Sequence, residues 1–434
     1  MANQFLAMKP IGICVLILIV CLPLIGVSAQ DETPIPEPIP PVDEGEYDIV
    51  NFLLIGSATY DSPNNPGLTD TLMLVSVNRT VGAVALVSIP RDLYVYIPGW
   101  GLDKINTVYF NAETHRIEGE GVALLKETIR YNLGFEIDYY ARVDFNGFME
   151  IIDAVGGVDV AVDCAIQDWR LIEPGLDPRI EENWEMFTLP MGLHHMNGDL
   201  ALWYVRSRRT SNELDRGRRQ QDVLRALWRH IRSQGLLDQL PSIWGQITQI
   251  VDTDITLPDI VGMVPLALTI DTSRIQSYRF REGVEISAGE SAEGSFIFLP
   301  NREAIIELGR QVVMPPTERQ LVQEQAVIEI INASGTSDLD RVMADRLASE
   351  GFVPRIVNEQ LPEQEATQIF DYTGQTKGSS IEVLQSALRL GNESIVFEPD
   401  PNRTVDFRIV IGRSYSRNSC TYNVLPPHEP DGQS

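Results

Sequence analysis

Short strand-like runs alternate with segments of helical periodicity along this chain, and this alternation restricts its fold more than any other feature. The strand-like runs are apolar and rich in β-branched residues, and they occupy residues 51–57, 71–77, 84–89 and 158–162. The turn-like stretch 78–83 joins two of them and predicts a hairpin. Residues 121–133 and 147–155 instead carry apolar side chains at helical spacing. The alternation predicts an α/β sandwich.

Changes in composition divide the 434 residues into several parts, since a chain of this length usually exceeds one compact domain. A second alternation of strands and helices between residues 326 and 414 predicts a smaller α/β domain. The predicted parts are an export signal or membrane anchor (1–30), a Pro- and acid-rich linker (31–47), a main domain (48–300), a second linker (301–325), the smaller domain (326–414) and a flexible tail (415–434).

The N-terminus carries an almost unbroken apolar run at residues 11–27, preceded by Lys9. A small-residue sequence that ends at Ala29 resembles a cleavage site, so a cleaved signal and a retained anchor both stay open. Either alternative places the rest of the chain outside the cytoplasm. In that compartment a disulfide between Cys164 and Cys420 is possible.

The charge distribution excludes one class of function and marks one segment. A net charge of −27 argues against a nucleic-acid binder and therefore against a transcriptional regulator, because phosphate backbones are bound through clustered positive surface. The segment 203–232 inverts this charge, with nine arginines, no lysine and three acids. It is either a solvated basic face or an anion site.

Two patterns in this segment favour the anion site. Residues 204–208 look strand-like, which would point Arg206 and Arg208 to one face. Residues 216–233 look helical, and helical steps back along their apolar stripe reach Gln220 and Arg216, so we expect these two side chains to face inward. Four further arginines, at 218, 225, 229 and 232, mostly fall outside the stripe and are expected to be solvated.

Asp70 and Arg91 are expected at one end of the predicted hairpin, because one precedes the first strand and the other follows the second. A carboxylate beside an arginine suits a metal-assisted phosphoryl site, and it equally suits a simple ion pair.

Taken together, five segments resemble the LytR–CpsA–Psr family of cell-wall enzymes. The matching words are LTDTLMLVSVN, VSIPRDLYVYIPGWGLDKIN, IDYYARVDFNGFMEIIDAVGGVDV, MNGDLALWYVRSRR and LDRGRRQQDVL, and they span the motif core 51–233. Residues 326–414 resemble the LytR C-terminal domain that often follows. The resemblance implies an α/β/α sandwich around a mainly antiparallel sheet, with a hydrophobic pocket for a polyprenyl-pyrophosphate-linked glycan.

The resemblance also implies an activity and a set of site residues. The enzymes are thought to transfer the glycan phosphate to a peptidoglycan hydroxyl. The arginines that match the pyrophosphate ligands are Arg91, Arg206, Arg208 and Arg216, with Gln220 as the matching glutamine. Asp70 and Arg91 then take the catalytic positions.

One departure from the family pattern concerns the metal. Family members commonly carry an Asp where this chain has Ala58, and that Asp shares Mg²⁺ with the position of Asp70. Mg²⁺ or Mn²⁺ at Asp70, with Asp61 as a possible replacement ligand, therefore stays an expectation. The main hypothesis is a phosphotransferase, and the alternatives are a polyprenyl-pyrophosphate-binding protein or a pyrophosphatase.

Overall fold

We describe a computed structural model for residues 35–59, 66–115, 120–173, 175–270, 274–314, 325–374 and 380–415. Residues 37–434 form one compact unit, separate from residues 1–36. Its four apolar clusters all consist of residues from Ile39 onward. Within the described ranges, no helix has both the length and the apolar character needed to cross a membrane. The apolar run at 11–27 lies outside those ranges.

A six-stranded sheet forms the centre of the main domain, in the order β11-β6-β1-β2-β3-β12. Its strands are β1 (Ile49–Ser57), β2 (Thr69–Asn78), β3 (Ala83–Ile89), β6 (Tyr139–Val143), β11 (Asp252–Thr253) and β12 (Ile275–Arg279). The β2–β3 hairpin is confirmed, with Leu72 opposite Ile89. Three of the five strand pairs are antiparallel and two are parallel. The prediction of a mainly antiparallel sheet is therefore confirmed.

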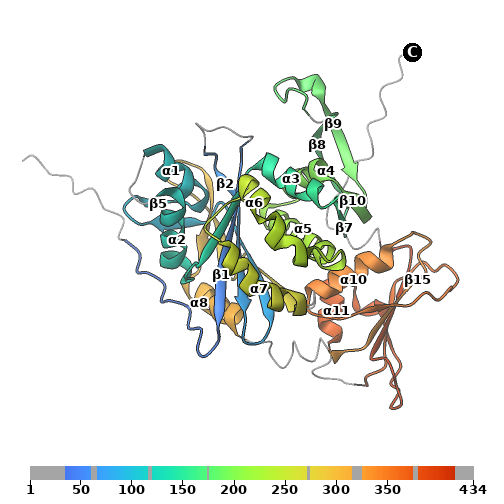
Figure 1. The fold of residues 1–434 in the computed structure, drawn as a ribbon. Coiled ribbons are helices and arrows are strands. Elements are labelled where there is room, and N and C mark those ends of the chain that lie inside the picture. The colour runs from blue at the N-terminus through green and yellow to red at the C-terminus, as the bar shows by residue number, and fades with distance from the viewer. Residues whose placement is uncertain are drawn as a thin grey trace, which may run out of the picture. The chain divides into compact units, whose positions relative to one another are not determined.

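Helices cover both faces of this sheet (Figure 1). Successive side chains of a strand point to opposite faces, so neighbouring residues of β2 pack against different helices. Leu72 and Leu74 of β2 pack with α1 (Val108–His115), α2 (Glu120–Leu133) and α8 (Arg302–Val313). Met73, which lies between them, packs with α5 (Glu213–Ser233) and α7 (Leu257–Thr269). These layers are the predicted α/β/α sandwich.

The remaining elements of the main domain build one side of the cavity described below or extend the domain. They are β4 (Tyr94–Ile97), β5 (Gly101–Lys104), α3 (Phe145–Ala154), β7 (Val158–Val162), β8 (Ile166–Leu171), β9 (Trp184–Leu189), β10 (Gly192–Met196), α4 (Gly198–Arg206), α6 (Leu240–Ile250), β13 (Ile286–Glu290) and β14 (Phe296–Pro300). Apolar side chains of α3, α4, β7 and β10 share one cluster with Val223 and Ala226 of α5.

The C-terminal part has its own sheet and its own core, as the sequence predicts. Its strands are β15 (Ile328–Asn332), β16 (Arg355–Ile356), β17 (Gln368–Asp371), β18 (Ile395–Phe397) and β19 (Phe407–Ile411), in the order β16-β15-β19-β17-β18. Helices α10 (Leu339–Ser349) and α11 (Ile381–Leu388) supply the other half of the core.

Both predicted linkers contain residues that belong to the core of the main domain. Ile39 is buried with α2 and α8, and its backbone N–H donates to the Tyr131 carbonyl at 2.8 Å. The second linker begins with α8, whose Ile305, Leu308 and Val312 are buried. Composition marked both stretches as polar, but a few apolar residues at regular spacing are enough to attach them.

Candidate active site: an apolar cavity ending in arginines

A cavity of about 520 Å³ lies between the central sheet and helices α3, α4 and α5. Its walls are mainly apolar and come from side chains far apart in sequence. They include Leu54, Met73, Val143, Phe145, Phe148, Ile151, Leu202, Val205, Val223, Leu224, Leu227 and Val251. A mainly apolar wall with a few polar groups is the usual composition of a small-molecule site. The predicted hydrophobic pocket is therefore present.

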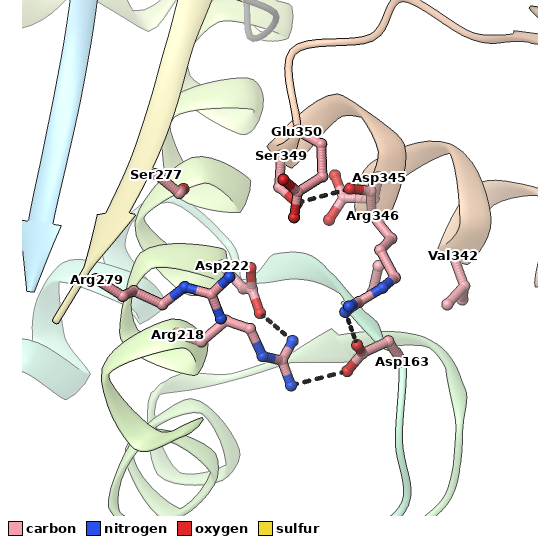
Figure 2. A pocket seen from close by; sticks show the side chains of 11 residues that line it. Asp163, Arg218, Asp222, Ser277, Arg279, Val342, Asp345, Arg346, Ser349 and Glu350 are labelled. Atoms are coloured by element: carbon pink, nitrogen blue, oxygen red, sulfur yellow. Dashed lines mark hydrogen bonds and ion pairs between the residues drawn. The ribbon is translucent and has the colours of Figure 1, made fainter. Parts of the chain in front are cut away.

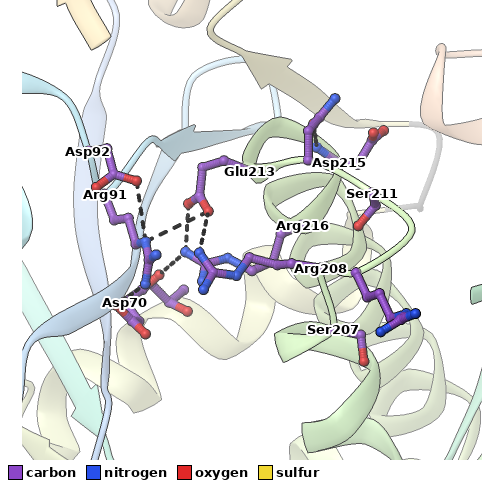
Figure 3. A network of polar contacts seen from close by, with 12 residues as sticks. Asp70, Arg91, Asp92, Ser207, Arg208, Ser211, Glu213, Asp215 and Arg216 are labelled. Carbon is purple, nitrogen blue, oxygen red and sulfur yellow. Dashed lines mark hydrogen bonds and ion pairs between the residues drawn. The ribbon is translucent and has the colours of Figure 1, made fainter. Parts of the chain in front are cut away.

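Beside the cavity lies a network of three carboxylates, Asp70, Asp92 and Glu213, and three guanidinium groups (Figure 3). Arg91 Nη1 donates to Asp70 Oδ1 at 2.8 Å, and Arg216 Nη2 donates to Glu213 Oε1 at 2.5 Å and to the Asp70 carbonyl at 2.8 Å. Glu213 Oε2 lies 3.8 Å from Arg91 Nε and 3.9 Å from Arg208 Nη1. Asp70, Arg208 and Arg216 also line the cavity.

This network leaves some of its buried polar atoms incompletely paired. Nε of Arg91, Nε of Arg216 and Oε2 of Glu213 are buried and make no hydrogen bond to any residue that the structure describes. An unmade hydrogen bond at a buried polar atom costs about 1–3 kcal/mol, and the adjoining cavity leaves room for another partner here.

The pKa shifts in the network follow from burial and from the neighbouring charges. Burial raises the pKa of the Glu213 carboxyl, although Arg216 and Arg91 oppose this shift. Burial also lowers the pKa of Arg216, and Arg91 lowers it further while Glu213 raises it. Burial lowers the pKa of Arg91 as well, but Asp70, Glu213 and Asp92 together raise it above its ordinary value. The site is therefore a crowded, partly desolvated group of charges.

Arg206 and Gln220 also lie on the cavity wall. The Arg206 guanidinium lies 4.1 Å from the centre of the Phe145 ring, and Gln220 Nε2 donates to Thr71 Oγ1 at 2.9 Å. Of the predicted site residues, the cavity is thus lined by Asp70, Arg206, Arg208, Arg216 and Gln220, and Arg91 is joined to Asp70 by an ion pair. Their roles as ligands or catalysts remain predictions.

The predicted strand at residues 204–208 is wrong, because α4 continues through Arg206. Asn197 caps the start of this helix by accepting from the Leu200 backbone N–H at 3.0 Å. Arg206 and Arg208 therefore reach the cavity from a helix end and the following loop. Arg219 holds that loop, donating to the carbonyl oxygens of Tyr204 and Ser207.

The expectation that Arg218 and Arg225 are solvated is also wrong. Arg218 is buried and pairs with Asp163 at 3.0 Å and with Asp222 at 3.1 Å, and Arg225 donates to the Ile275 carbonyl. Arg229, which was also expected to be solvated, pairs with Asp345 of α10. Their partners lie on other elements, which helical periodicity alone cannot reveal.

Asp163 also pairs with two arginines of the C-terminal part, of which Figure 2 shows Arg346. Arg346 of α10 pairs with its Oδ2, and Arg389 lies 3.6 Å from the same oxygen. The next residue, Cys164, is disulfide-bonded, and all other cysteines of the chain lie outside the described ranges.

Asp70 is the only acid of the expected metal pair that the structure describes. The described residues contain no group of three or more His, Cys, Asp or Glu side chains that could hold a metal ion. Ala58 supplies no ligand, Asp61 lies outside the described ranges, and Asp70 is already paired with Arg91. Taken alone, the described residues therefore do not form a metal site.

Glu213 and Arg219 are the site residues that sequence reasoning missed. Glu213 is the first residue of α5, and Asn212 caps this helix by accepting from the Asp215 backbone N–H at 2.9 Å. An Asn–Glu pair at a helix start inside an arginine-rich segment was the available signal. Nothing in the sequence marked Arg219 apart from its neighbours.

Comparison with known proteins finds several relatives of this chain. Among characterised relatives, the probable cell wall biosynthesis protein LcpB of Corynebacterium glutamicum is 36% identical over 172 residues, which cover 39% of this chain and only 36% of LcpB. The polyisoprenyl-teichoic acid–peptidoglycan teichoic acid transferase TagT of Bacillus subtilis is 28% identical over 56% of this chain and 69% of TagT. TagU of Oceanobacillus iheyensis, a transferase of the same description, is 30% identical over 49% of this chain and 61% of TagU.

The fold and the family models give the same assignment. The crystal structure of TagV from B. subtilis matches 61% of this chain and 96% of its own, with a TM-score of 0.50 and 23% identity, which supports the fold alone. The model of the LytR C-terminal domain, described as a LytR cell envelope-related transcriptional attenuator, matches residues 325–415. The LytR_cpsA_psr family model matches residues 28–310, well over half of the chain, and the protein belongs to the LytR–CpsA–Psr family.

Proposed function

We propose that this protein is an extracytoplasmic phosphotransferase that moves a glycopolymer from a polyprenyl-pyrophosphate carrier to a peptidoglycan hydroxyl. The observation that carries the proposal is that an apolar cavity of about 520 Å³ adjoins an arginine network. Some buried N–H groups of this network make no hydrogen bond to any described residue. A polyprenyl pyrophosphate has the matching chemistry, with a long apolar tail and a compact polyanionic head.

Two further observations support this substrate class. TagT and TagU, both relatives of this chain, are named as transferases that act on polyisoprenyl-linked teichoic acid and peptidoglycan. The apolar run at 11–27 is expected to export or anchor the chain, which would bring it to lipid carriers on the outer side of the membrane. The identity of the glycan is left open.

In the proposed reaction the protein binds and orients the substrate through groups it already holds in place. Arg91, Arg208 and Arg216 neutralise the pyrophosphate and the charge that develops on it, while Gln220 contacts a phosphate oxygen. An acceptor hydroxyl attacks the sugar-linked phosphorus, and the lipid phosphate leaves. The hydroxyl proton goes to one of the carboxylates at this end of the cavity, Asp70 or Glu213.

A divalent cation is part of the proposal only as an addition to this chemistry. Mg²⁺ or Mn²⁺ would supply Lewis-acid stabilisation of phosphate oxygens, and it would need those oxygens and water as ligands besides Asp70. Asp61 is the second candidate ligand in the sequence.

The lack, among the described residues, of a group of acids that could hold a metal ion favours two alternatives. A protein that binds the same lipid head group without efficient transfer, or that uses water as the acceptor and acts as a pyrophosphatase, needs the cavity and the arginines but not a complete metal site. Both alternatives share the binding step, so the experiment must measure binding and turnover separately.

The test compares Arg208→Ala and Arg216→Ala with Arg79→Ala in the full chain. Arg79 is a matched control, because its side chain is as exposed as that of Arg208, 46% in both cases, and pairs with a carboxylate away from the cavity. A charge-assisted hydrogen bond contributes about 1.5–3 kcal/mol, so each site variant should weaken prenyl-pyrophosphate binding by roughly tenfold or more.

Transfer of a glycan from its lipid carrier to peptidoglycan, measured with the same variants, separates the alternatives. Wild-type binding with glycan transfer supports the phosphotransferase, release of free phosphorylated glycan supports the pyrophosphatase, and binding without either product supports the binding protein. Equal binding by all three variants would refute the arginine site itself.

A further inference from the structure

Helices α6 and α7 form an unusual part of the main domain, because neither contains a single buried residue. Both helices are rich in apolar side chains. Over their 24 positions, 11 in α6 and 13 in α7, the only ionisable side chain is Asp259. In a chain with a net charge of −27, so large an uncharged surface is an exception that needs a physical reason.

The apolar side chains of α7 that face outward lie along one stripe. At 3.6 residues per turn, Leu257, Val261 and Leu268 fall within about 40° of one another around the helix axis. Their exposed fractions are 40%, 50% and 48%. On a helix at a water-exposed protein surface, an apolar stripe of this kind normally packs against the core.

The opposite side of α7 is where the helix contacts the protein. Leu266 packs against an apolar cluster that includes Met73 and Leu86 of the central sheet. Asp259 points the same way and accepts a hydrogen bond from the Tyr139 hydroxyl at 3.0 Å. The one charged side chain is therefore turned inward, while the apolar stripe is turned outward.

The outward face of α6 continues this uncharged surface. Its exposed positions carry only small or neutral polar side chains, such as Ser242, Gln246 and Gln249. The acids that follow α6 are paired, Asp252 with Arg142 at 3.0 Å and Asp254 with Lys126 at 2.8 Å. The acids that follow α6 are thus neutralised, whereas Asp238, just before α6, is exposed.

The surface adjoins the cavity. Val251, the residue directly after α6, lines the cavity, and Ile250 lies against Gly147 of α3, one residue before the cavity-lining Phe148. A molecule resting against α6 and α7 is therefore close to the apolar end of the proposed lipid site.

We propose that α6 and α7 rest on the outer surface of a phospholipid bilayer, with the stripe of Leu257, Val261 and Leu268 at the acyl boundary. Helices with an apolar face commonly lie in this interface. The proposal rests on the proposed function, since it gives a polyprenyl chain a path from the bilayer into the cavity that avoids water.

A bilayer fits this surface better than a second copy of the chain. A stable protein interface usually buries about 800 Å² per partner and has a rim of polar and charged groups. The outward faces of α6 and α7 carry apolar and neutral polar side chains but no charged ones, so they lack the charged groups of such a rim. A fluid apolar phase needs no matching shape and no matching charge.

The experiment measures vesicle binding of residues 31–434, which retain every residue of the four apolar clusters. The vesicles are phosphatidylcholine without substrate lipid. The double variant Val261→Asp/Leu268→Asp is compared with wild type, and Val353→Asp in the C-terminal part is the matched control, because Val353 is 51% exposed.

We expect wild type and Val353→Asp to float with the vesicles, and the double variant to lose on the order of tenfold or more in partitioning. Binding should be insensitive to ionic strength, because it is not driven by charge. Unchanged thermal unfolding of the double variant shows that it is folded. Equal flotation of all three proteins, or none by wild type, would overturn the proposal.

Two further measurements distinguish other outcomes. A wild-type dimer in light scattering that the double variant abolishes would assign this surface to contact between copies instead. Binding of a water-soluble short-chain prenyl pyrophosphate should be unchanged in the double variant, because the arginines are intact. If wild type did not bind the short-chain prenyl pyrophosphate, this would refute the proposed function but not the membrane contact.

Discussion

Two arginine clusters include residues of helix α5, and they differ in the space beside them. The open cluster consists of Arg91, Arg208 and Arg216 around Asp70 and Glu213, beside the cavity (Figure 3). The closed cluster consists of Arg218, Arg346 and Arg389 around Asp163, and Figure 2 shows its Arg218 and Arg346. Only Gly217 separates Arg216 from Arg218, yet they belong to different clusters.

The difference between the clusters concerns space. The open cluster borders a cavity of about 520 Å³, whereas the cavity beside Asp163 and Arg218 holds only about 20 Å³. Both clusters keep a buried guanidinium Nε without a hydrogen bond to any described residue, as at Arg216 and Arg218. A buried arginine therefore indicates a ligand only where there is room for one. The following predictions test this distinction.

The largest effect is expected from Asp163→Asn in the closed cluster. The substitution removes the carboxylate charge shared by Arg218, Arg346 and Arg389, and an uncompensated buried charge is strongly destabilising. We expect the free energy of unfolding to fall by about 3–5 kcal/mol, measured by denaturant unfolding of the full chain. Asp199→Asn, which breaks an ion pair with Arg170 alone, is the control and should cost less.

A smaller effect should appear in the pH dependence of the same cluster. Burial raises the pKa of Asp163, but Arg218, Arg346 and Arg389 outweigh burial and hold this pKa at about 2. A carboxyl whose pKa is lowered on folding stabilises the protein above its unfolded value of 3.8 and loses that contribution as the pH falls toward 2. The difference of about two pKa units corresponds to roughly 2 kcal/mol.

The stability gap between wild type and Asp163→Asn should therefore shrink as the pH falls from 5 to 2, as measured by thermal unfolding. A gap that stays constant over this range would mean that the Asp163 carboxylate is not the charge that holds the cluster.

A more modest change is expected from Glu213→Gln in the open cluster. Glu213 is the carboxylate that the three arginines share, so it competes with an incoming pyrophosphate for the same N–H groups. Removing its charge should tighten binding of inorganic pyrophosphate by on the order of fivefold, measured by calorimetry. Glu307→Gln, on an exposed ion pair of α8, is the control.

Weaker pyrophosphate binding by Glu213→Gln would contradict this competition. It would indicate instead that the carboxylate orients Arg91 and Arg216 for the ligand, which makes Glu213 a positioning residue.

The fold and much of the open cluster could be predicted from the sequence because the relevant signals are local. Period-two and helical patterns identify β1, β2, β3 and α5, and the helical stripe alone turns Arg216 and Gln220 toward the cavity. The pairing of Asp70 with Arg91 follows from the hairpin register. The closed cluster could not be predicted, because Arg218 and Arg346 meet at Asp163 across more than one hundred residues of sequence.

Arg206 shows why a local pattern can also mislead. Its neighbours Tyr204 and Val205 favour a strand, but the Asn197 cap and the burial of Leu202 and Val205 stabilise a helix. Tertiary packing determined the conformation of this short segment, because its intrinsic preference for a strand was weak. Arg206 still lines the cavity, because a strand and a helix over these residues would both end next to α5.

The smallest expected effect concerns Ala58, and it tests whether the open cluster lacks a metal ligand. Ala58→Asp adds a hard oxygen donor at the end of β1, near Asp70. It should tighten Mn²⁺ binding a few-fold in the presence of a prenyl pyrophosphate. The reason is that the new carboxylate, Asp70 and phosphate oxygens together leave fewer of the six ligand positions to water. Mn²⁺ binding is measured by electron paramagnetic resonance, and glycan transfer is measured separately.

If Asp61 already supplies the second ligand, Ala58→Asp changes little and Asp61→Ala removes the metal dependence. If the protein only binds lipid, Mn²⁺ affinity rises in Ala58→Asp without turnover, and lipid binding survives Asp70→Ala. Full wild-type transfer that neither a chelator nor Asp70→Ala reduces would show that the arginines act without any metal.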